Sequence, residues 1–578
     1  MAPIWFRMNW KHRLLSLATA TVVTTSSYAQ QAVTPLGSTT APEEVFGYTK
    51  KDKDLLEAPI FGQKAYFTRH FGRLAPRYEL RLPANFVDYA VDNKLELSLR
   101  SYLQLVLANN VDIDVQRLNV EIQRNAITRA YAPFDPFLTG SFNSQRSVTP
   151  TTSVLEGAQT LNQLSQPSNF SYNQTLANGV QFNSGFTASR FTTNNSFAFF
   201  NPALNAQLVS GVTIPLLRNR GTMINKLPIT IARSRLRISQ ENFLTTVFQL
   251  LTTAEQAYWD LIGARESLRV QEKALELSAE ALKRSRRELE LGAISPLDIY
   301  QPEANYASAE IQVLQARYRL QQAEDVLRRQ MGADLDVKFR QMPISLTESV
   351  TPPADNAEID REKAVEKALR LRPEIRSINE QLQADDLVLK QQTNLLRPDF
   401  SLRGTYLSTG RGGRFLQRVG PNTTIIPGGF GDALDQVFGF GFPIYSFGLT
   451  MRLPIRDRAA AANYADAVVG KRQDILARRS TEQNVRQQVL NAVSQVESSK
   501  ASVKLAIVAQ GFAQKQLDAE QKKYDLGTSV IFFVLDAQTR LVNAEAALVN
   551  QTVLYRRNLL NLLRVTGELL DERGIKVQ

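Results

Sequence analysis

The amino-acid sequence predicts a mainly α-helical protein with a β part, in which long coiled-coil hairpins alternate with groups of strands. Three observations predict this fold class. Two runs, about 228–291 and 459–526, contain almost no helix breakers. At 1.5 Å per residue, each would form a helix roughly 95–100 Å long. Stretches of alternating apolar and polar residues precede both runs, and the whole arrangement occurs twice in the chain.

Residues 1–29 have the pattern of an export signal. A basic start is followed by an apolar run over residues 14–23 and by the small residues Ser27 and Ala29. A membrane anchor is disfavoured because spanning a bilayer core takes about 20 apolar residues. No later run is long enough either, so a mature chain that enters a membrane would do so as a closed β-barrel. Cleavage after Ala29 would lower the formal charge from +12 by the three basic residues of the signal, to +9.

The remaining sequence divides into two repeats. Residues 97–138 match about 360–400 at an offset of 262, and both segments pass from a helix through a proline, Pro136 or Pro398, into a strand-like run. A second match at an offset of 235 aligns Gly292 with Gly527. We therefore expect the following organisation: an N-terminal extension that the sequence does not assign, a first repeat, a linker, a second repeat and a C-terminal tail, over residues 30–94, 95–332, 333–359, 360–567 and 568–578.

Apolar residues of the predicted hairpins follow steps of three and four, the spacing of coiled coils. The first stripe contains Val247, Leu251, Ala254, Tyr258, Leu261, Leu268, Leu275, Ala279 and Leu282. The second contains Leu297, Tyr300, Ala304, Ala307, Ile311, Leu314 and Tyr318. Such a pattern alone fits any coiled-coil protein, so the strands beside the hairpins carry more information.

Period-two alternation over residues 207–214, 400–406 and 447–453 predicts strands. The same pattern suits a membrane-barrel strand and a half-buried soluble strand. Two strands in each repeat give four per chain, and four strands cannot close a membrane barrel. A dimer or a trimer would both satisfy this count. We assign a further alternating run, 180–188, to a hairpin beyond the membrane, and expect 149–168 and 410–435 to be exposed loops.

Composition argues against catalysis. The chain contains no cysteine and only two histidines, His12 and His70, so disulfides, thiolate metal sites and histidine clusters are excluded. Cleavage of the signal would leave only His70, which disfavours a hydrolytic triad, and we expect no enzyme activity, cofactor or metal. A basic cluster, Lys283, Arg284, Arg286 and Arg287, could suggest nucleic-acid binding, but basic runs on long helices are usually solvated.

The order of these segments resembles the TolC-like outer-membrane efflux proteins over about residues 95–567. The resemblance rests on the doubled order, on Ala257–Leu261 in the long helix, on Ile214–Leu217 leaving a strand, and on the turns Leu291–Asp298 and Leu526–Val530. It implies a homotrimer whose helices form an α-barrel tunnel through the periplasm and whose strands form a shared 12-stranded outer-membrane β-barrel. It also implies a channel that exports small molecules or proteins when docked to a periplasmic adaptor and an inner-membrane pump. A periplasmic coiled-coil adaptor or structural protein of an export complex is the alternative.

The two glycine turns are the candidate docking tips. Each joins two long helices at the end away from the strands, and a glycine can adopt the left-handed cap conformation at little cost. We expect Gly292 and Gly527 to form the turns, and Ala293, Ile294, Thr528, Ser529 and Val530 to contact the adaptor.

Matching residue by residue, the resemblance places a resting gate near the tips at Asp298, Tyr524 and Asp536. The family's tip arginine is replaced by Ser529 and one of its aspartates by Phe533, so the lock should differ here. Asp298 also fits a helix-capping role after Ser295 and Pro296. The resulting hypothesis is an apolar constriction at Phe533 with an acidic ring at Asp536 that favours cations.

Overall fold

The computed structural model describes residues 86–91, 93–151, 156–335, 338–349, 359–419 and 422–575. The chain divides into two units, Met1–Leu80 and Arg81–Gln578, and every described residue belongs to the second. The predicted signal peptide, both histidines and most of the predicted N-terminal extension lie outside the described residues. Among the described residues, none of the helices combines the length and the apolar character that crossing a membrane requires.

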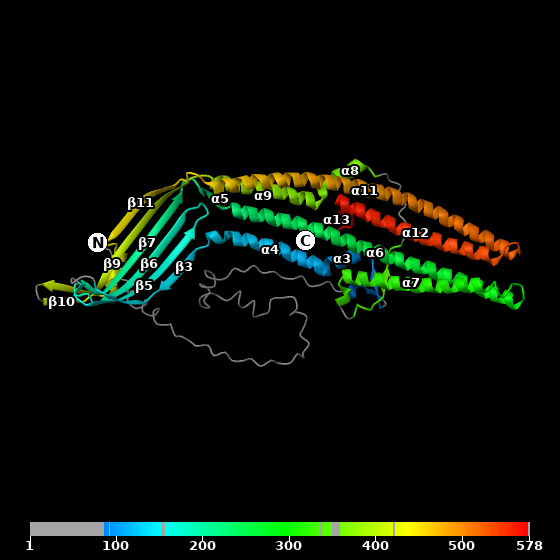
Figure 1. Cartoon of the computed structure of the whole chain (residues 1–578), viewed down its shortest axis with the longest axis horizontal. Helices are drawn as coiled ribbons and strands as arrows, with labels where there is room; N and C mark the ends of the chain where they lie inside the picture. The colour runs from blue at the N-terminus through cyan, green and yellow to red at the C-terminus, as the bar shows by residue number, and fades with distance from the viewer. Residues whose placement is uncertain are drawn as a thin grey trace, which may run out of the picture. The chain divides into compact units, whose positions relative to one another are not determined.

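Four long helices form two antiparallel hairpins. They are α6 (Leu227–Glu290) with α7 (Tyr300–Gln330), and α11 (Arg458–Asp525) with α12 (Ile531–Thr566). The two longest helices begin and end within one residue of their predicted bounds. The strands of the larger sheet lie at one end of this unit and the two hairpin turns at the other, as Figure 1 shows.

The helices that open each repeat are divided in two, where the sequence predicted one. α3 (Leu99–Asn109) is followed by α4 (Val111–Tyr131), and α8 (Arg361–Leu371) by α9 (Pro373–Leu395), at the predicted offset of 262. Asn110 breaks the first pair because its backbone is extended and its side chain caps the amides of Asp112 and Ile113. Arg372 breaks the second because it precedes Pro373, which disfavours the helical conformation.

The predicted coiled-coil stripe of α6 is buried over its first half, from Val247 to Leu261, within the largest apolar core. The stripe predicted for α7 is not buried within the chain. Ile311, Leu314 and Tyr318 are all more than half exposed, whereas Val313 and Ala316 on the opposite side of the helix face the chain's interior. Within the described part of the chain, the predicted stripe is therefore not the packed face of α7.

All strands near one end belong to a single antiparallel sheet of eight strands. The sheet contains β3 (Phe137–Phe142), β4 (Gln145–Pro150), β5 (Thr160–Thr175), β6 (Gln181–Thr193), β7 (Phe200–Pro215), β9 (Asp399–Val419), β10 (Asn422–Ile426) and β11 (Pro443–Arg452). β3 and β4 share one side of β5, and β10 and β11 share one side of β9. Six strands therefore lie side by side.

This count corrects the expectation of four strands per chain, from which the count of 12 strands for a trimer was obtained. β5 and β6 pair continuously with each other, and β6 pairs with β7, so the run at 180–188 is an integral part of the sheet and not a separate hairpin. Most of the predicted loop 149–168 is β4 and β5, although residues 152–155 lie outside the described part of the chain. The Ser, Asn and Gln residues of this segment led to the prediction of a loop. The same residue types also occupy alternate positions of a strand that has one polar face.

The second predicted loop, 410–435, is also structured. β9 continues to Val419, and α10 (Phe430–Phe438) follows β10 and packs on the sheet. Ala433 and Val437 of α10 are buried against Ala206 of β7. A Cβ atom at Gly410 would lie 2.0 Å from the carbonyl oxygen of Ala433 in α10, and one at Gly412 would lie 2.1 Å from that of Gly429, the N-cap of α10, so glycine permits this close approach.

A small second sheet is located halfway along the helices. β1 (Ala90–Val91) pairs with β2 (Lys94–Leu97), which pairs in parallel with β8 (Ile344–Leu346). Leu95 and Leu97 are fully buried and join the core around α6. The end of the predicted N-terminal extension and strand β8 of the predicted linker therefore form one structure packed on the helices.

The predicted C-terminal tail is also packed on the helices. It contains α13 (Leu569–Glu572), and Leu569 and Ile575 are buried in the same core. Arg573 forms an ion pair with the fully buried Glu255 of α6 at 2.5 Å, which gives that carboxylate the partner that burial requires.

Candidate functional site: the helical tips and the channel wall

The turn between α6 and α7 has the geometry of a glycine helix cap. Gly292 has a φ of +66°, and its amide donates to the carbonyl of Leu289. The amide of Ala293 donates to the carbonyl of Glu288 at 2.8 Å. These bonds satisfy carbonyls that the helix end leaves without partners.

The turn between α11 and α12 repeats this geometry. Gly527 has a φ of +71° and donates to the carbonyl of Tyr524, while Thr528 donates to that of Lys523 at 2.9 Å. No atom lies within 4 Å of a Cβ built at either glycine, so the backbone conformation alone requires glycine here. The predicted turn geometry is confirmed at both tips.

The exposure of the predicted docking residues is uneven. Ala293, Thr528 and Val530 are exposed, whereas Ile294 and Ser529 are half-buried. The most exposed apolar side chains at the tips are Leu291, Leu297 and Leu526, each at least 75% exposed, and none of them was predicted to contact the adaptor.

Arg284 joins the two hairpins just above the tips. Its guanidinium lies 2.8 Å from Asp525 Oδ1 and 3.0 Å from Glu288 Oε1, and stacks 4.5 Å above the ring of Tyr524. The Tyr524 hydroxyl donates to Glu288 Oε2 at 2.5 Å. We call these four residues the tip network. It connects the end of α6 with the end of α11.

The tip network affects its own protonation. Partial burial, together with the hydrogen bond to Glu288, raises the pKa of Tyr524 to about 12. The hydrogen bond from Arg284 lowers the pKa of Asp525. Tyr524 therefore remains a neutral hydroxyl donor at physiological pH, and Asp525 stays ionised. Arg284 was predicted to be a solvated residue of a basic cluster; the structure shows it paired.

The other predicted gate residues have separate contacts within the chain. Asp298 Oδ2 accepts from the amide of Ser295 at 3.2 Å, which is the capping geometry. Helix α7 itself begins only at Tyr300, so the cap holds the turn before it. Asp536 pairs with Arg540 at 2.8 Å, one turn further along α12. Phe533 is 52% exposed and contacts Phe532, its ring centroid 5.6 Å away. The structure thus brings Tyr524 alone of the predicted gate residues into a link between hairpins.

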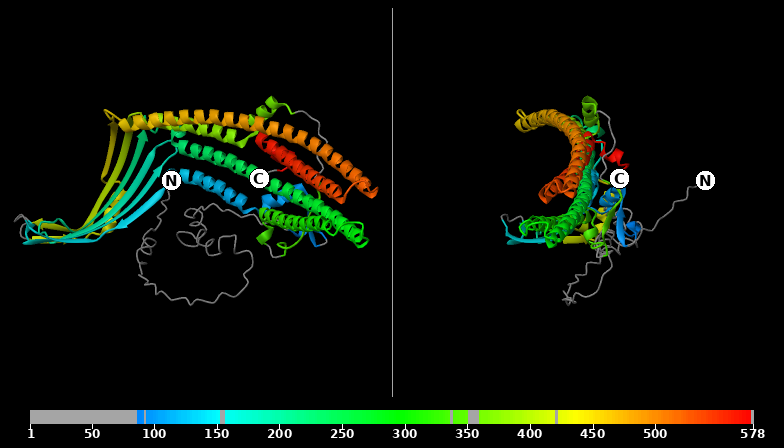
Figure 2. Two further views of the ribbon diagram at one scale, coloured as in Figure 1. Left: turned by 45° about the vertical axis from the view of Figure 1, so that its right-hand side comes forward. Right: turned by 90° about the vertical axis from the view of Figure 1, so that its right-hand side faces the viewer.

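The helices form a wall one layer deep, which is curved when viewed along the helices (Figure 2, right). Near the tips the order across the wall is α7, α6, α12, α11; near the sheet it is α4, α6, α9, α11. One flank of the chain therefore consists of α7, α4 and strands β3 and β4, and the other of α11 with β10 and β11.

Both flanks carry exposed apolar stripes at matching heights. On α7 the stripe is Ile311, Leu314 and Tyr318, and on α11 it is Leu505, Val508 and Phe512. Both have the coiled-coil spacing of three and four. Ile311 and Val508 each lie 19 residues from the glycine of their turn. Such stripes are the surfaces that a second copy could cover.

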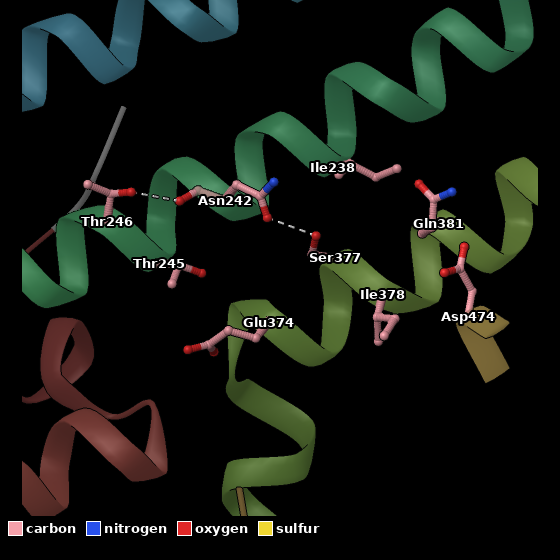
Figure 3. Close-up of a pocket in the computed structure, with 9 residues that line it drawn as sticks. All are labelled: Ile238, Asn242, Thr245, Thr246, Glu374, Ser377, Ile378, Gln381 and Asp474. Carbon is pink, nitrogen blue, oxygen red and sulfur yellow. Dashed lines mark hydrogen bonds between the residues drawn. The ribbon is translucent and has the colours of Figure 1, made fainter. Parts of the chain in front are cut away.

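A cavity of about 530 Å³ lies between α6 and α9, near α11 (Figure 3). Its polar lining includes Asn242 and Ser377, which are joined by a hydrogen bond of 2.9 Å across the two helices. Gln381 and Asp474 line its end, and Gln381 also donates to Asp385 at 3.1 Å. No group of metal-binding side chains occurs within the described ranges of the chain.

Asp385 gives this region a pH dependence. Burial first, and then hydrogen bonding and repulsion from Asp474, raise the pKa of Asp385 from 3.8 to about 6; the charge of Asp386, which is itself paired with Lys471, adds to the increase. Because this pKa is higher in the folded than in the unfolded chain, stability is lost as the pH rises from about 4 through 6. We expect the thermal unfolding temperature to rise as the pH falls from 7 to 5, and Asp385→Asn to weaken that rise. An Asp385→Asn variant with the parent's pH profile would contradict this assignment.

The comparison with known families agrees with this architecture. The family model described as outer membrane efflux protein matches residues 102–333 and 364–568, which is most of the chain and includes both hairpins. The chain belongs to the outer membrane efflux protein family. This confirms the predicted resemblance to TolC-like proteins, the outer-membrane location with an extension into the periplasm, and the role in export.

Two curated relatives illustrate the relationship. The outer membrane efflux protein BepC of Brucella suis is 25% identical over 491 residues, which cover 84% of this chain and 88% of BepC. The outer membrane protein TolC of Escherichia coli is 25% identical over 352 residues, covering 60% of this chain and 66% of TolC. The names of these efflux family members describe outer-membrane and efflux proteins rather than enzymes.

Solved structures share the fold of this efflux family member. CusC aligns with a TM-score of 0.58 at 16% identity, covering 86% of this chain and 99% of CusC. The Campylobacter jejuni CmeC outer membrane channel aligns with a TM-score of 0.56 at 16% identity, covering 86% of this chain and 91% of CmeC. The open state of the Neisseria gonorrhoeae MtrE outer membrane channel aligns with a TM-score of 0.56 at 17% identity, covering 86% of this chain and 98% of MtrE.

Proposed function

We propose that three copies of this chain form the exit duct of a tripartite efflux or type I secretion system, which exports small molecules or proteins across the outer membrane. The observation that carries this proposal is the presence of two unpartnered flanks on one chain. The apolar stripe of α7 and the stripe of α11 lie at the same height, and the sheet has open edges above them. When one flank of a chain fits the opposite flank of an identical copy, repeating this head-to-tail contact closes a ring.

The helical tips would dock a periplasmic adaptor, which in turn contacts an inner-membrane pump. Supporting this role, the tips present exposed leucines and valine in two turns of the same geometry. Exposed apolar side chains at the end of a rod are suited to contacts with a partner.

The tip network would hold the duct closed at rest. Arg284, Glu288, Tyr524 and Asp525 tie the two hairpins together. Asp536 remains a candidate for the acidic ring and Phe533 for the apolar constriction, since both are partly exposed on α12. Asp298 has a capping role in this scheme.

The docking role can be tested with charges at the tips. We expect Ile294→Asp combined with Val530→Asp to abolish export and adaptor cross-linking, because a buried unpaired charge would oppose an apolar contact. The trimer should remain intact, since both residues lie beyond the flank stripes. The measurement is substrate export together with cross-linking to the adaptor. Normal export by this double variant would disprove docking through these residues.

A further inference from the structure

The large sheet contains more strands than the sequence predicted. Hairpin β5–β6 adds two strands to the four that the sequence predicted, and nothing in the exit-duct proposal requires them. The pairing of β5 with β6 begins at Gln163 opposite Thr193 and ends at Thr175 opposite Gln181. The pairing of β6 with β7 begins at Gln181 opposite Thr213 and ends at Phe191 opposite Ala203. The hairpin is thus in the middle of the sheet.

The two faces of the sheet differ in polarity over all six strands. Directly opposite residues of antiparallel strands share a face, so the registers assign every paired residue. One face carries mainly apolar residues: Phe170, Tyr172, Phe182, Phe186, Leu208, Val212, Leu402, Tyr406, Phe447, Leu449 and others in phase with them. The other carries Thr139, Ser171, Asn173, Asn183, Thr187, Asn205, Gln207, Thr405 and Ser446. β5 and β6 follow this division less strictly than β7 and β11, because their mainly apolar face also carries Gln166, Ser168, Gln174, Ser184 and Arg190. The alternation around Phe170, Tyr172, Phe182 and Phe186 is still the pattern of barrel strands between lipid and water.

The width of six strands matches the width of the helical wall beneath them. Strands about 4.8 Å apart and tilted by about 40° each take about 6.3 Å of a barrel's circumference, so six occupy about 38 Å. Four helices packed 8–10 Å apart occupy about 32–40 Å. Four strands would occupy only about 25 Å. With six strands, the sheet and the four helices α4, α6, α9 and α11 cover the same arc.

We infer that three copies close an 18-stranded barrel, in which β11 of one copy pairs with β3 of the next and the polar face lines the pore. This inference rests on the proposed trimer. Because barrel diameter grows roughly linearly with strand number, the pore would be about 1.5 times as wide as that of a 12-stranded barrel. The duct then does not narrow where it enters the membrane, which suits bulky, polar cargo.

Helix α10 does not block this pore. Its contacts Ala206, Leu208 and Phe186 all belong to the apolar face, so it lies outside the barrel. It also covers an open edge of β9, where Gln436 bonds both the amide and the carbonyl of Arg411. Capping an edge in this way replaces the ladder bonds that β10 and β11 do not provide there.

The polar face has a positive charge. Among the residues that the ladders pair, its charged side chains are Arg403, Arg411 and Arg452, with Asp399 alone of opposite sign. Three copies would place nine arginines around the pore, which favours anions. By contrast, Arg190 pairs with Leu204 and lies on the apolar face.

Cysteine cross-linking tests the proposed pairing of β11 with β3, because the chain has no cysteine of its own. Thr139 lies on β3. Ser446 and Thr450 lie on β11, two pleat repeats apart, and all three residues are on the polar face. We expect Thr139→Cys with Thr450→Cys or with Ser446→Cys to give a covalent trimer after treatment with a short bis-maleimide in outer-membrane fractions. Thr139→Cys with Gln207→Cys, on a central strand, is the control and should give none.

The position of the hairpin is tested within one chain. Ser141 and Asn169 are directly paired between β3 and β5, and a cysteine at each should form an intrachain disulfide.

Deleting residues 160–193 would leave four strands per copy. Since pore area scales with the square of diameter, we expect the single-channel conductance to fall about twofold and smaller polyethylene glycols to be excluded. If the deletion variant fails to assemble, the two cysteine experiments still decide.

The lining is tested by selectivity in planar bilayers. Arg403→Gln with Arg411→Gln should reduce anion preference, measured as reversal potential in a salt gradient, whereas Arg190→Gln should not. An unchanged reversal potential in the double variant would overturn the assignment of the polar face to the pore.

The outcomes separate this inference from the proposed function. Trimers that form without the β11–β3 cross-link, or a deletion variant with unchanged conductance, would overturn the 18-stranded barrel and leave the trimeric duct standing. Absence of any trimer would instead overturn the proposed function.

Discussion

Replacing Arg284 with alanine should open the resting channel. The change removes the guanidinium from Asp525, Glu288 and the ring of Tyr524 at once, so α6 and α11 lose their link above the tips. These groups are exposed or only partly buried, so water screens their contacts, and we expect a shift from closed to open of about fivefold at most. The measurement is the resting conductance of the protein in planar bilayers.

Two comparisons sharpen this experiment. Tyr524→Phe removes only the 2.5 Å hydrogen bond to Glu288 and should have a smaller effect in the same direction. Arg286→Ala is the matched control, because Arg286 pairs with Glu303 inside one hairpin and joins nothing across the two. Equal conductance in Arg284→Ala and the parent would place the resting lock elsewhere. Phe533→Ala and Asp536→Ala then become the next variants, with expected effects on resting conductance and on cation preference.

The helices of this chain could be predicted closely because each depends on local sequence. An absence of breakers defined α6 and α11, and the left-handed glycines at Gly292 and Gly527 defined their ends. The break at Arg372 was also encoded locally, by Pro373, and was missed because the apolar spacing continues across it.

The strands were predicted less completely, for a physical reason. One face of β5 carries mostly Ser, Asn and Gln, and the other face also carries Gln166, Ser168 and Gln174, so the composition of this strand resembles that of a loop. The apolar residues between them, Phe170 and Tyr172, contained the signal. Period two was therefore present in the sequence, but composition alone obscured it.

The tip network could not be predicted from local patterns. Tyr524 and Glu288 are 236 residues apart, and the contact arises only because the long helices of two hairpins end side by side. Arg284 and Glu288, four residues apart on one helix face, gave a weak signal that an ion pair was present. The resemblance supplied Tyr524, but the partners of Tyr524 came from the structure.

A charge placed in a flank stripe should prevent ring formation. Leu314 on α7 and Val508 on α11 are each about half exposed in the single chain, on the side of the helix opposite to its packed face. In the proposed ring, each would be covered by the neighbouring copy. We expect Leu314→Asp combined with Val508→Asp to abolish the trimer, because an unpaired buried charge costs several kcal/mol and each ring contains three such interfaces. The mass of the detergent-extracted protein, measured by light scattering, reports the result.

A control separates the stripe from a general effect of added charge. Gln312 is exposed on α7 but lies outside the stripe, so Gln312→Asp should leave the trimer unchanged. The single chain should keep its fold in both variants, since neither stripe contributes to the apolar cores within the chain. Circular dichroism would verify this through the helix content. A stable trimer carrying both aspartates would show that the flanks of this chain do not meet, and the ring would then have to close through other surfaces.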